Sequence, residues 1–185
     1  MNENQYIVTY TGEKIYPTRP DPKNIHIADI AHALANKCRF NGHTRVFYSV
    51  AQHSVAVDTF FPYENLWGLL HDAGEAYLPD VASTLKPCFP TLVIAEAACM
   101  DAIKKRFRLP ELSENQKRLL KSIDRAMLKA EWESLMNNPK NYSMGVSTEG
   151  ASTLHWKPSG FWNPIEAERV FLRAFDERMK KTSCT

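Results

Sequence analysis

A pair of ionisable residues inside an apolar segment constrains this chain more than any other feature. His71 and Asp72 come directly after the apolar run Leu66–Leu70, and Glu75 follows three residues later. Burying such groups costs several kcal/mol unless they are paired or bound to a metal ion. A lone buried histidine is usually a core residue hydrogen-bonded to a backbone carbonyl, but here one explanation has to cover three residues.

Apolar residues recur at helical spacing through most of the chain, which predicts an all-α helical bundle. The 185 residues, 44% of them hydrophobic, fit a single domain over 1–185. A short β-hairpin is expected over 5–17, and an irregular segment over 137–163. The expected helices span residues 29–40, 47–60, 65–77, 91–107, 113–136 and 164–180.

Charge and cysteine content exclude several classes of function. Lys and Arg number 23 against 21 Asp and Glu, without a long run of either sign, so we expect no nucleic-acid partner. The apolar runs are too short to span a bilayer, and no secretory signal is apparent, so we expect a cytoplasmic protein without a membrane partner. The cysteines form no C-x-x-C pair and are expected to be reduced: Cys38, Cys88, Cys99 and Cys184.

Two more ionisable residues interrupt apolar helical patterns. His53 lies in the middle of the segment expected at 47–60, and Asp124 lies inside the segment expected at 113–136. With His71 and Asp72 they supply two imidazoles and two carboxylates from three helices. Helical bundles commonly build metal sites from inward side chains of facing helices. This mixed nitrogen and oxygen set suits Zn, Mn, Co or Fe better than Ca.

The order of these four residues resembles the H…HD…D signature of the HD-domain phosphohydrolases: His53, His71, Asp72 and Asp124. The residues around them, above all those over 71–86, are similar to small bacterial 5′-deoxyribonucleotidases and to phage and prophage deoxyadenosine triphosphate triphosphohydrolases. The resemblance implies an HD-domain bundle in which these four side chains bind a divalent ion. It points to Zn, Co or Mn, with Mg as a candidate second ion, and to a homo-oligomer.

The resemblance extends from about residue 27 to residue 136 and implies two catalytic roles. Glu75 would take or give a proton during hydrolysis, and Asp80 would help to orient the attacking water. We expect Glu75 to share a helix face with the metal ligand four residues before it. Alternatives remain: Glu75 can be a buried charge paired with Lys86 or Arg39, and Asp80 an ordinary turn residue.

Four residues are candidates for binding the substrate. In the related nucleotidases an arginine and an aromatic residue precede the first metal histidine and contact phosphate and base, which implies these roles for Arg39 and Phe40. An Arg fork suits phosphate oxygens, and an aromatic face can stack on a base. Alternatively, Arg39 offsets the dipole at the end of a helix and Phe40 fills the core. His43 and Lys86 are further phosphate candidates.

Three functions are compatible with these residues. The first is hydrolysis of a deoxynucleoside triphosphate, with dATP expected, to the deoxynucleoside and triphosphate. The second is a 5′-nucleotidase that acts on deoxynucleoside monophosphates. The third is a nucleotide sensor without turnover, which would need neither Glu75 nor Asp80 beside the metal. The segment 38–44 resembles the phage and prophage branch and favours the triphosphohydrolase.

Overall fold

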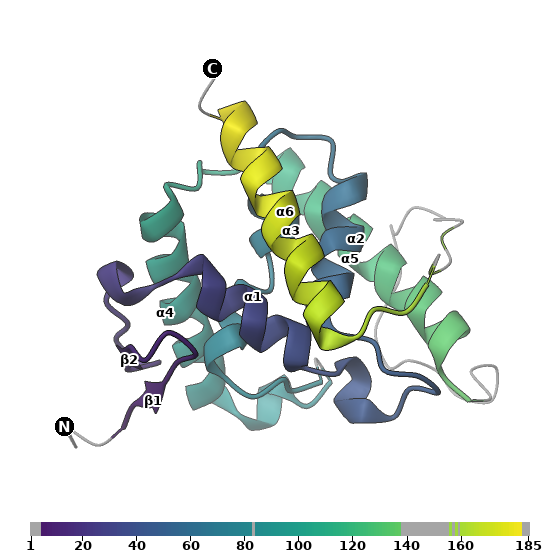
Figure 1. Ribbon diagram of the computed structural model, residues 1–185, viewed down its shortest axis with the longest axis horizontal. Coiled ribbons are helices and arrows are strands. Elements are labelled where there is room, and N and C mark those ends of the chain that lie inside the picture. The colour runs from purple at the N-terminus through teal and green to yellow at the C-terminus, as the bar shows by residue number, and fades with distance from the viewer. Residues whose placement is uncertain (1–4, 83, 138–155, 157, 159, 183–185) are drawn as a thin grey trace.

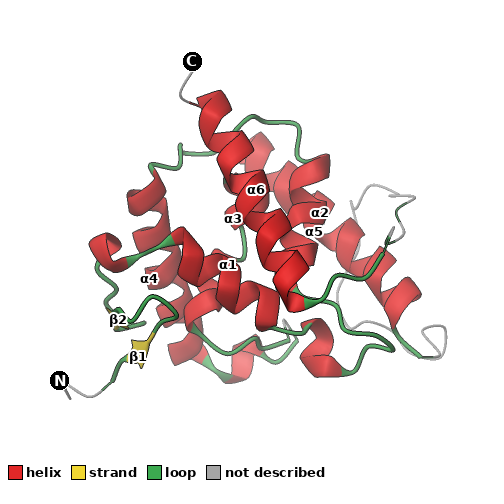
Figure 2. Ribbon diagram, viewed as in Figure 1, coloured by secondary structure: helices red, strands yellow, loops and turns green. Residues whose placement is uncertain are grey.

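The computed structural model describes residues 5–82, 84–137, 156, 158 and 160–182 (Figure 1). These residues form helices and one short hairpin, so the expected all-α class with an N-terminal β-hairpin is confirmed (Figure 2). In chain order the elements are β1 (Ile7–Val8), β2 (Lys14–Ile15), η1 (Pro22–Asn24), α1 (Ile27–Asn36), η2 (Arg39–Gly42), α2 (Val50–Phe60), α3 (Trp67–Leu70), η3 (Ala73–Tyr77), η4 (Lys86–Cys88), α4 (Pro90–Phe107), α5 (Glu114–Leu135) and α6 (Pro164–Thr182), where η marks a 3₁₀ turn.

The hairpin is tied to the first helix. β1 pairs antiparallel with β2, and the turn between them contains Gly12 at φ 89°. The backbone N–H and the hydroxyl of Thr11 both donate to the carboxylate of Asp29 on α1, at 2.7 and 2.9 Å. Asp29 is buried, and these two hydrogen bonds satisfy it. The hairpin therefore lies against the helical body rather than apart from it (Figure 1).

Side-chain caps fix where the two helices that carry metal-ligand candidates begin. Ser49 precedes α2, and its hydroxyl accepts the N–H of Gln52. Ser113 precedes α5 and forms a capping box with Gln116, in which each side chain accepts the other residue's backbone N–H. The capping box predicted from the sequence is confirmed.

The expected helix over 65–77 is not continuous. α3 ends at Leu70, and a 3₁₀ turn begins at Ala73, with Asp72 between them at φ −105° and ψ 13°. The expectation that Glu75 continues the α-helical face of His71 is therefore wrong. The ammonium of Lys37, the residue after α1, donates to the carbonyls of Glu75 and Leu78. These carbonyls therefore have a hydrogen-bond donor without a further helical turn.

The first helix ends earlier than expected, at Asn36. The following backbone pairs with the segment before α2, because the N–H of Arg39 donates to the carbonyl of Tyr48 at 2.8 Å. Arg39 and Phe40 were expected at the end of the helix, but they lie in the separate turn η2. Phe40 and Asn41 have φ values of 54° and 51°, a left-handed conformation that is costly without glycine and often occurs at functional sites.

Two apolar cores hold the helices in place. In the larger core α1, α2, α3, α4 and α6 meet, and α6 crosses the front of the bundle (Figure 1). A smaller core between α2 and α5 contains Val57, Phe61, Ile123 and Met127. Ile123 directly precedes Asp124, so this second core fixes that carboxylate against α2. No helix in the described part of the chain is long and apolar enough to cross a membrane.

The other helix predictions agree with the structure to within a few residues. The helix expected at 91–107 is α4, the one at 113–136 is α5 and the one at 164–180 is α6. Most of the segment expected to be irregular, 137–163, lies outside the described residues.

Candidate active site

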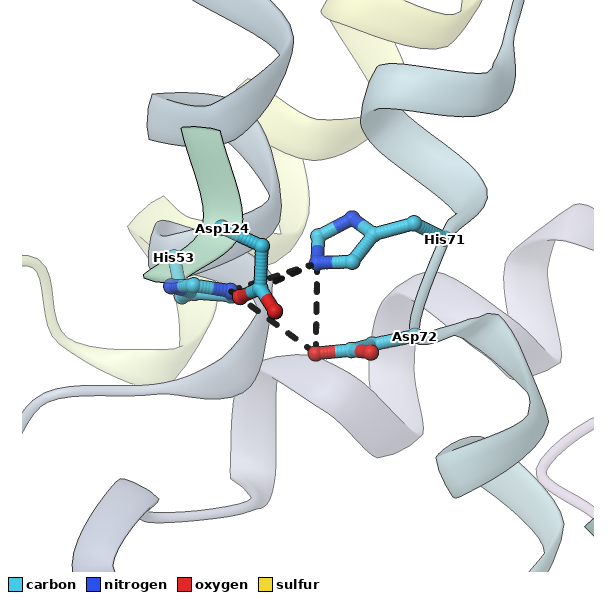
Figure 3. A group of neighbouring side chains, drawn as sticks. All are labelled: His53, His71, Asp72 and Asp124. Atoms are coloured by element: carbon cyan, nitrogen blue, oxygen red, sulfur yellow. Dashed lines mark hydrogen bonds and ion pairs between the residues drawn. The ribbon is translucent and has the colours of Figure 1, made fainter. Parts of the chain in front are cut away.

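Four side chains from three parts of the fold converge on one point (Figure 3). His53 comes from the middle of α2, His71 and Asp72 come from the break between α3 and η3, and Asp124 comes from α5. One ligand atom from each residue lies within 4.8 Å of the others. The structure therefore brings together all four residues predicted as metal ligands.

The distances between the ligand atoms suit a single ion. His53 Nε2 lies 3.3 Å from His71 Nε2 and 3.2 Å from Asp124 Oδ1. His71 Nε2 lies 3.3 Å from Asp72 Oδ2 and 3.9 Å from Asp124 Oδ1. Bonds of about 2.0–2.2 Å to a transition metal place neighbouring ligand atoms about 3–4 Å apart. The two imidazoles and two carboxylates thus fit a divalent ion in both spacing and donor type.

Hydrogen bonds at the far side of each imidazole orient its metal-facing nitrogen. His71 Nδ1 donates to the carbonyl oxygen of Gly68 at 2.9 Å, and that oxygen can only accept. His53 Nδ1 lies 2.8 Å from Oε1 of the buried carboxylate of Glu131. Both rings therefore direct an Nε2 lone pair at the cluster, and two such lone pairs 3.3 Å apart require a proton or a cation between them.

The charges of the cluster compensate one another. Burial opposes ionisation of Asp72, but the neighbouring His71 imidazole outweighs burial and lowers the pKa of that carboxyl. Burial lowers the pKa of His71, but the charge and hydrogen bond of Asp72, together with the charge of Asp124 and the Gly68 carbonyl, raise this pKa to about 9. The carboxylate of Asp124 is likewise kept ionised, against burial, by its contact with His53, which lowers its pKa. Two carboxylates so arranged favour a bound cation.

A pocket of about 670 Å³ opens beside the cluster. It contains every residue predicted to act on the substrate, together with two of the metal-ligand candidates, Asp72 and Asp124. The lining residues predicted from the sequence as catalytic or substrate-binding are Arg39, Phe40, His43, Glu75, Asp80 and Lys86.

Glu75 is a buried carboxyl in this pocket. Burial, and then the charges of Asp72 and Asp80, raise its pKa to about 8. Its Oε2 atom has no hydrogen-bond partner among the described residues. The alternative in which Glu75 pairs with Lys86 finds no support, because the Lys86 ammonium instead contacts both carboxylate oxygens of Glu96, at 2.7 and 2.8 Å. A carboxyl with this pKa can hold or release a proton near neutral pH.

Arg39 lies between the cluster and the pocket. Its Nε is 3.0 Å from Oε2 of Glu131, and its Nη1 is 3.9 Å from Oδ2 of Asp72. Burial works to lower its pKa, but the surrounding carboxylates, Glu131 first, outweigh burial and raise it. The guanidinium is therefore permanently charged. Phe40 lies beside it, 5.7 Å from the guanidinium to the ring centroid, and meets Trp132 edge to face at 6.1 Å.

The pocket also contains residues that sequence reasoning missed. Lys121 and Arg125 lie on α5 on either side of Asp124, four residues apart and so on one helix face, and Trp132 lies further along the same helix. The buried Glu131 was missed too, although it follows Asp124 by seven residues and so shares its helix face. That spacing indicates the helix face of Glu131 but not its contact with His53.

A second cavity, of about 460 Å³, reaches the cluster from the other side. His71 and Asp124 border it, and the rest of its lining combines apolar with charged side chains: Trp67, Met100, Asp101, Lys104, Glu111, Leu112, Lys117, Leu120 and Lys121. Neither Arg39 nor Glu75 belongs to it. The larger pocket, which holds these groups, is therefore the candidate substrate site.

Fold and site together define an all-α protein with a buried His and Asp cluster that can hold a metal ion. The chain belongs to the same family as two bacterial proteins described as uncharacterized, YfdR of Escherichia coli and RCAP_rcc00048 of Rhodobacter capsulatus. It is 36% identical to YfdR over 131 residues, which cover 70% of this chain and 72% of YfdR. It is 34% identical to the Rhodobacter protein over 137 residues, which cover 68% and 70% of the two chains. No protein-family model matches the sequence.

Proposed function

We propose that this chain is a metal-dependent phosphohydrolase of the HD type that hydrolyses deoxynucleoside triphosphates, with dATP preferred, to the deoxynucleoside and triphosphate. The observation that carries the proposal is the convergence of four metal-ligand candidates beside a pocket that two of them, Asp72 and Asp124, line together with a buried carboxyl and several cations. Zn, Co or Mn is the proposed ion. The resemblance of the motifs to HD-domain enzymes supports the same reaction.

The chain's own residues have distinct roles in this reaction. A divalent ion held by the cluster would polarise a phosphoryl oxygen of the substrate and activate a water molecule. Water adds to the α-phosphorus and the bond to the 5′-oxygen breaks, so the nucleoside leaves as an alcohol and the triphosphate keeps the water oxygen. Glu75 holds a proton near neutral pH and can deliver it to the departing 5′-oxygen. Asp80, on the same pocket wall, orients the water.

Cations of the pocket support a substrate with several phosphates. Arg39 uses Nε to contact Glu131, which leaves its terminal nitrogens for phosphate oxygens. Lys121 and Arg125 add two more positive charges along the α5 side of the pocket, and the exposed His43 lies at its rim. A triphosphate chain needs such an extended cationic wall, whereas a monophosphate does not.

Aromatic residues at one side of the pocket support a nucleobase. Phe40 and Trp132 meet edge to face, so the exposed part of either ring can pack against a planar base. The left-handed backbone at Phe40 and Asn41 holds this aromatic residue next to Arg39. The preference for a purine follows from the resemblance to the phage enzymes. As for those enzymes, we propose a homo-oligomer.

One observation favours a second function, a 5′-nucleotidase for deoxynucleoside monophosphates. Lys86, a predicted phosphate-binding residue, is neutralised by Glu96 at 2.7 Å. If that ion pair persists when substrate binds, one fewer cation is available for a triphosphate chain. Arg39 alone would then serve a single phosphate beside the metal.

Product identification distinguishes these functions. The purified protein is incubated with Mn²⁺ or Co²⁺ and a panel of deoxynucleoside mono- and triphosphates, and products are followed by ³¹P NMR. Triphosphate as the first product from dATP is expected. Orthophosphate or pyrophosphate as the first product would contradict this function and favour the 5′-nucleotidase. Much faster turnover of dAMP than of dATP would do the same. Tight nucleotide binding without turnover would instead support the third function, a nucleotide sensor.

A further inference from the structure

Glu131 makes two contacts with the two halves of the site. It lies on α5 and is fully buried. Its Oε1 accepts from His53 Nδ1 at 2.8 Å, and its Oε2 lies 3.0 Å from Arg39 Nε. One carboxylate therefore joins a metal-ligand candidate from α2 to the candidate phosphate-binding arginine from η2.

The position is costly for a residue with a purely structural role. A buried carboxylate loses its hydration, and only charged or hydrogen-bonding partners can compensate for that loss. The buried Tyr48 hydroxyl is a third neighbour of this carboxylate, but the two charged partners, His53 and Arg39, face the cluster or the pocket with their remaining nitrogens. A carboxylate that only stabilised helix packing would not need to contact His53, a candidate metal ligand, or Arg39, a candidate phosphate-binding residue.

The contact with His53 decides what the imidazole offers to a metal ion. Because Oε1 accepts the Nδ1 proton, Nε2 is left with its lone pair directed at the cluster. Carboxylate partners of this kind fix the ring orientation, make the ring a better ligand and typically contribute about 10–100-fold to metal affinity.

The contact with Arg39 decides which nitrogens the guanidinium offers to an anion. The ion pair between Nε and Glu131 leaves the two terminal nitrogens on the edge toward the cluster, where Nη1 lies 3.9 Å from Oδ2 of Asp72. A phosphate oxygen on the metal side would thus meet a fork held in a fixed direction.

We propose that Glu131 is a positioning residue that fixes the metal-binding form of His53 and the direction of Arg39 at the same time. The part that concerns His53 requires only the metal centre, whereas the part that concerns Arg39 rests on the proposed phosphohydrolase function. The two parts can be tested separately in the full-length protein.

Zinc affinity tests the first part. Glu131→Gln is compared with the wild type and with Glu133→Gln, a matched control on the exposed side of the same helix. Competition with a chromophoric chelator should show Zn²⁺ affinity lowered by about 10–100-fold in Glu131→Gln and unchanged in Glu133→Gln. In the Zn²⁺-loaded protein, the NMR signal of the His53 ring N–H should move upfield, because an amide is a weaker acceptor than a carboxylate.

Steady-state kinetics test the second part, with KM and kcat determined separately for each variant. Glu131→Gln and Arg39→Met should each raise the KM for dATP at saturating metal. The double variant should be no worse than Arg39→Met alone, because Glu131 acts on KM through Arg39. Fully additive effects would overturn this part of the proposal.

The outcomes separate failure of the inference from failure of the proposed function. If the wild-type protein binds no Zn²⁺, the proposed metal centre is itself wrong. Zinc binding by the wild type with equal affinity in Glu131→Gln overturns the positioning role and leaves the metal centre intact. Should Glu131→Gln fail to fold, Glu131→Asp is used in its place. This variant keeps the negative charge on a side chain that is shorter by one methylene. It should show the same loss of affinity, and an unchanged affinity would again overturn the proposal.

Discussion

His71 Nε2 and Asp72 Oδ2 lie 3.3 Å apart, although the two residues are adjacent in the chain. Successive residues of an α-helix point about 100° away from each other, so a continuous helix would separate these groups. The end of α3 and the start of η3 at this position allow both side chains to face the same point (Figure 3). The break in the helix is therefore part of the metal-ligand arrangement.

Removal of either of these side chains should abolish metal binding and activity together. His71→Ala deletes one of two converging imidazoles, and Asp72→Ala deletes one of two carboxylates, which leaves three ligands at most. Metal content of the purified variants, measured by plasma emission spectrometry, checks this result. Asp176→Ala, at an exposed position on α6, serves as the control and should retain its metal. Full occupancy in both variants would contradict the ligand assignment.

Glu75→Gln should retain the metal but lower turnover of the preferred nucleotide by about 100-fold or more, because it removes a proton donor and acceptor while it preserves shape. The measurement is kcat at saturating substrate, with metal content confirmed on the same sample. A kcat close to that of the wild type would make Glu75 structural, and loss of the metal would make it a ligand.

The same carboxyl should make the stability of the metal-free protein depend on pH. Burial and the charges of Asp72 and Asp80 raise the pKa of Glu75 to about 8 from 4.5, so the folded protein keeps a proton that the unfolded chain loses within this window. The free energy of unfolding must then fall as pH rises from about 4.5 to 8. Glu75→Gln removes this loss, which is on the order of 4 kcal/mol at the upper end of the window.

Thermal unfolding of chelator-treated protein tests this dependence. The melting temperature of Glu75→Gln should exceed that of the wild type by several degrees at about pH 8, and by much less at about pH 5. An equal difference at both pH values would mean that the effect comes from packing and not from the titration of Glu75.

Lys121 and Arg125 should matter more for a triphosphate than for a monophosphate. They add positive charge to the pocket wall on either side of Asp124 without being ligands themselves. Lys121→Ala and Arg125→Ala should raise the KM for dATP by about 10-fold, the loss of roughly one charge-assisted contact, and change the KM for dAMP little. Lys129→Ala, exposed one turn further along α5, is the control. Equal effects on both nucleotides would place the phosphate chain elsewhere.

Features that depend on neighbouring residues in the chain could be predicted from the sequence. Helical periodicity gave the positions of α2, α4, α5 and α6, and the Ser113 capping box needs only residues three positions apart. The cluster of candidate metal ligands could be predicted because charged groups in apolar segments are costly, which makes His53, His71, Asp72 and Asp124 conspicuous without any knowledge of their contacts.

Features that depend on distant contacts were decided only by the tertiary structure. The helix expected at 65–77 breaks at Asp72, and the later carbonyl of Glu75 receives the ammonium of Lys37, which lies thirty-eight residues earlier. Arg39 leaves the first helix because its backbone pairs with Tyr48. Glu131 resembles any glutamate of a long helix until α5 packs against α2 and brings it to His53, since local propensity cannot specify which helix faces meet.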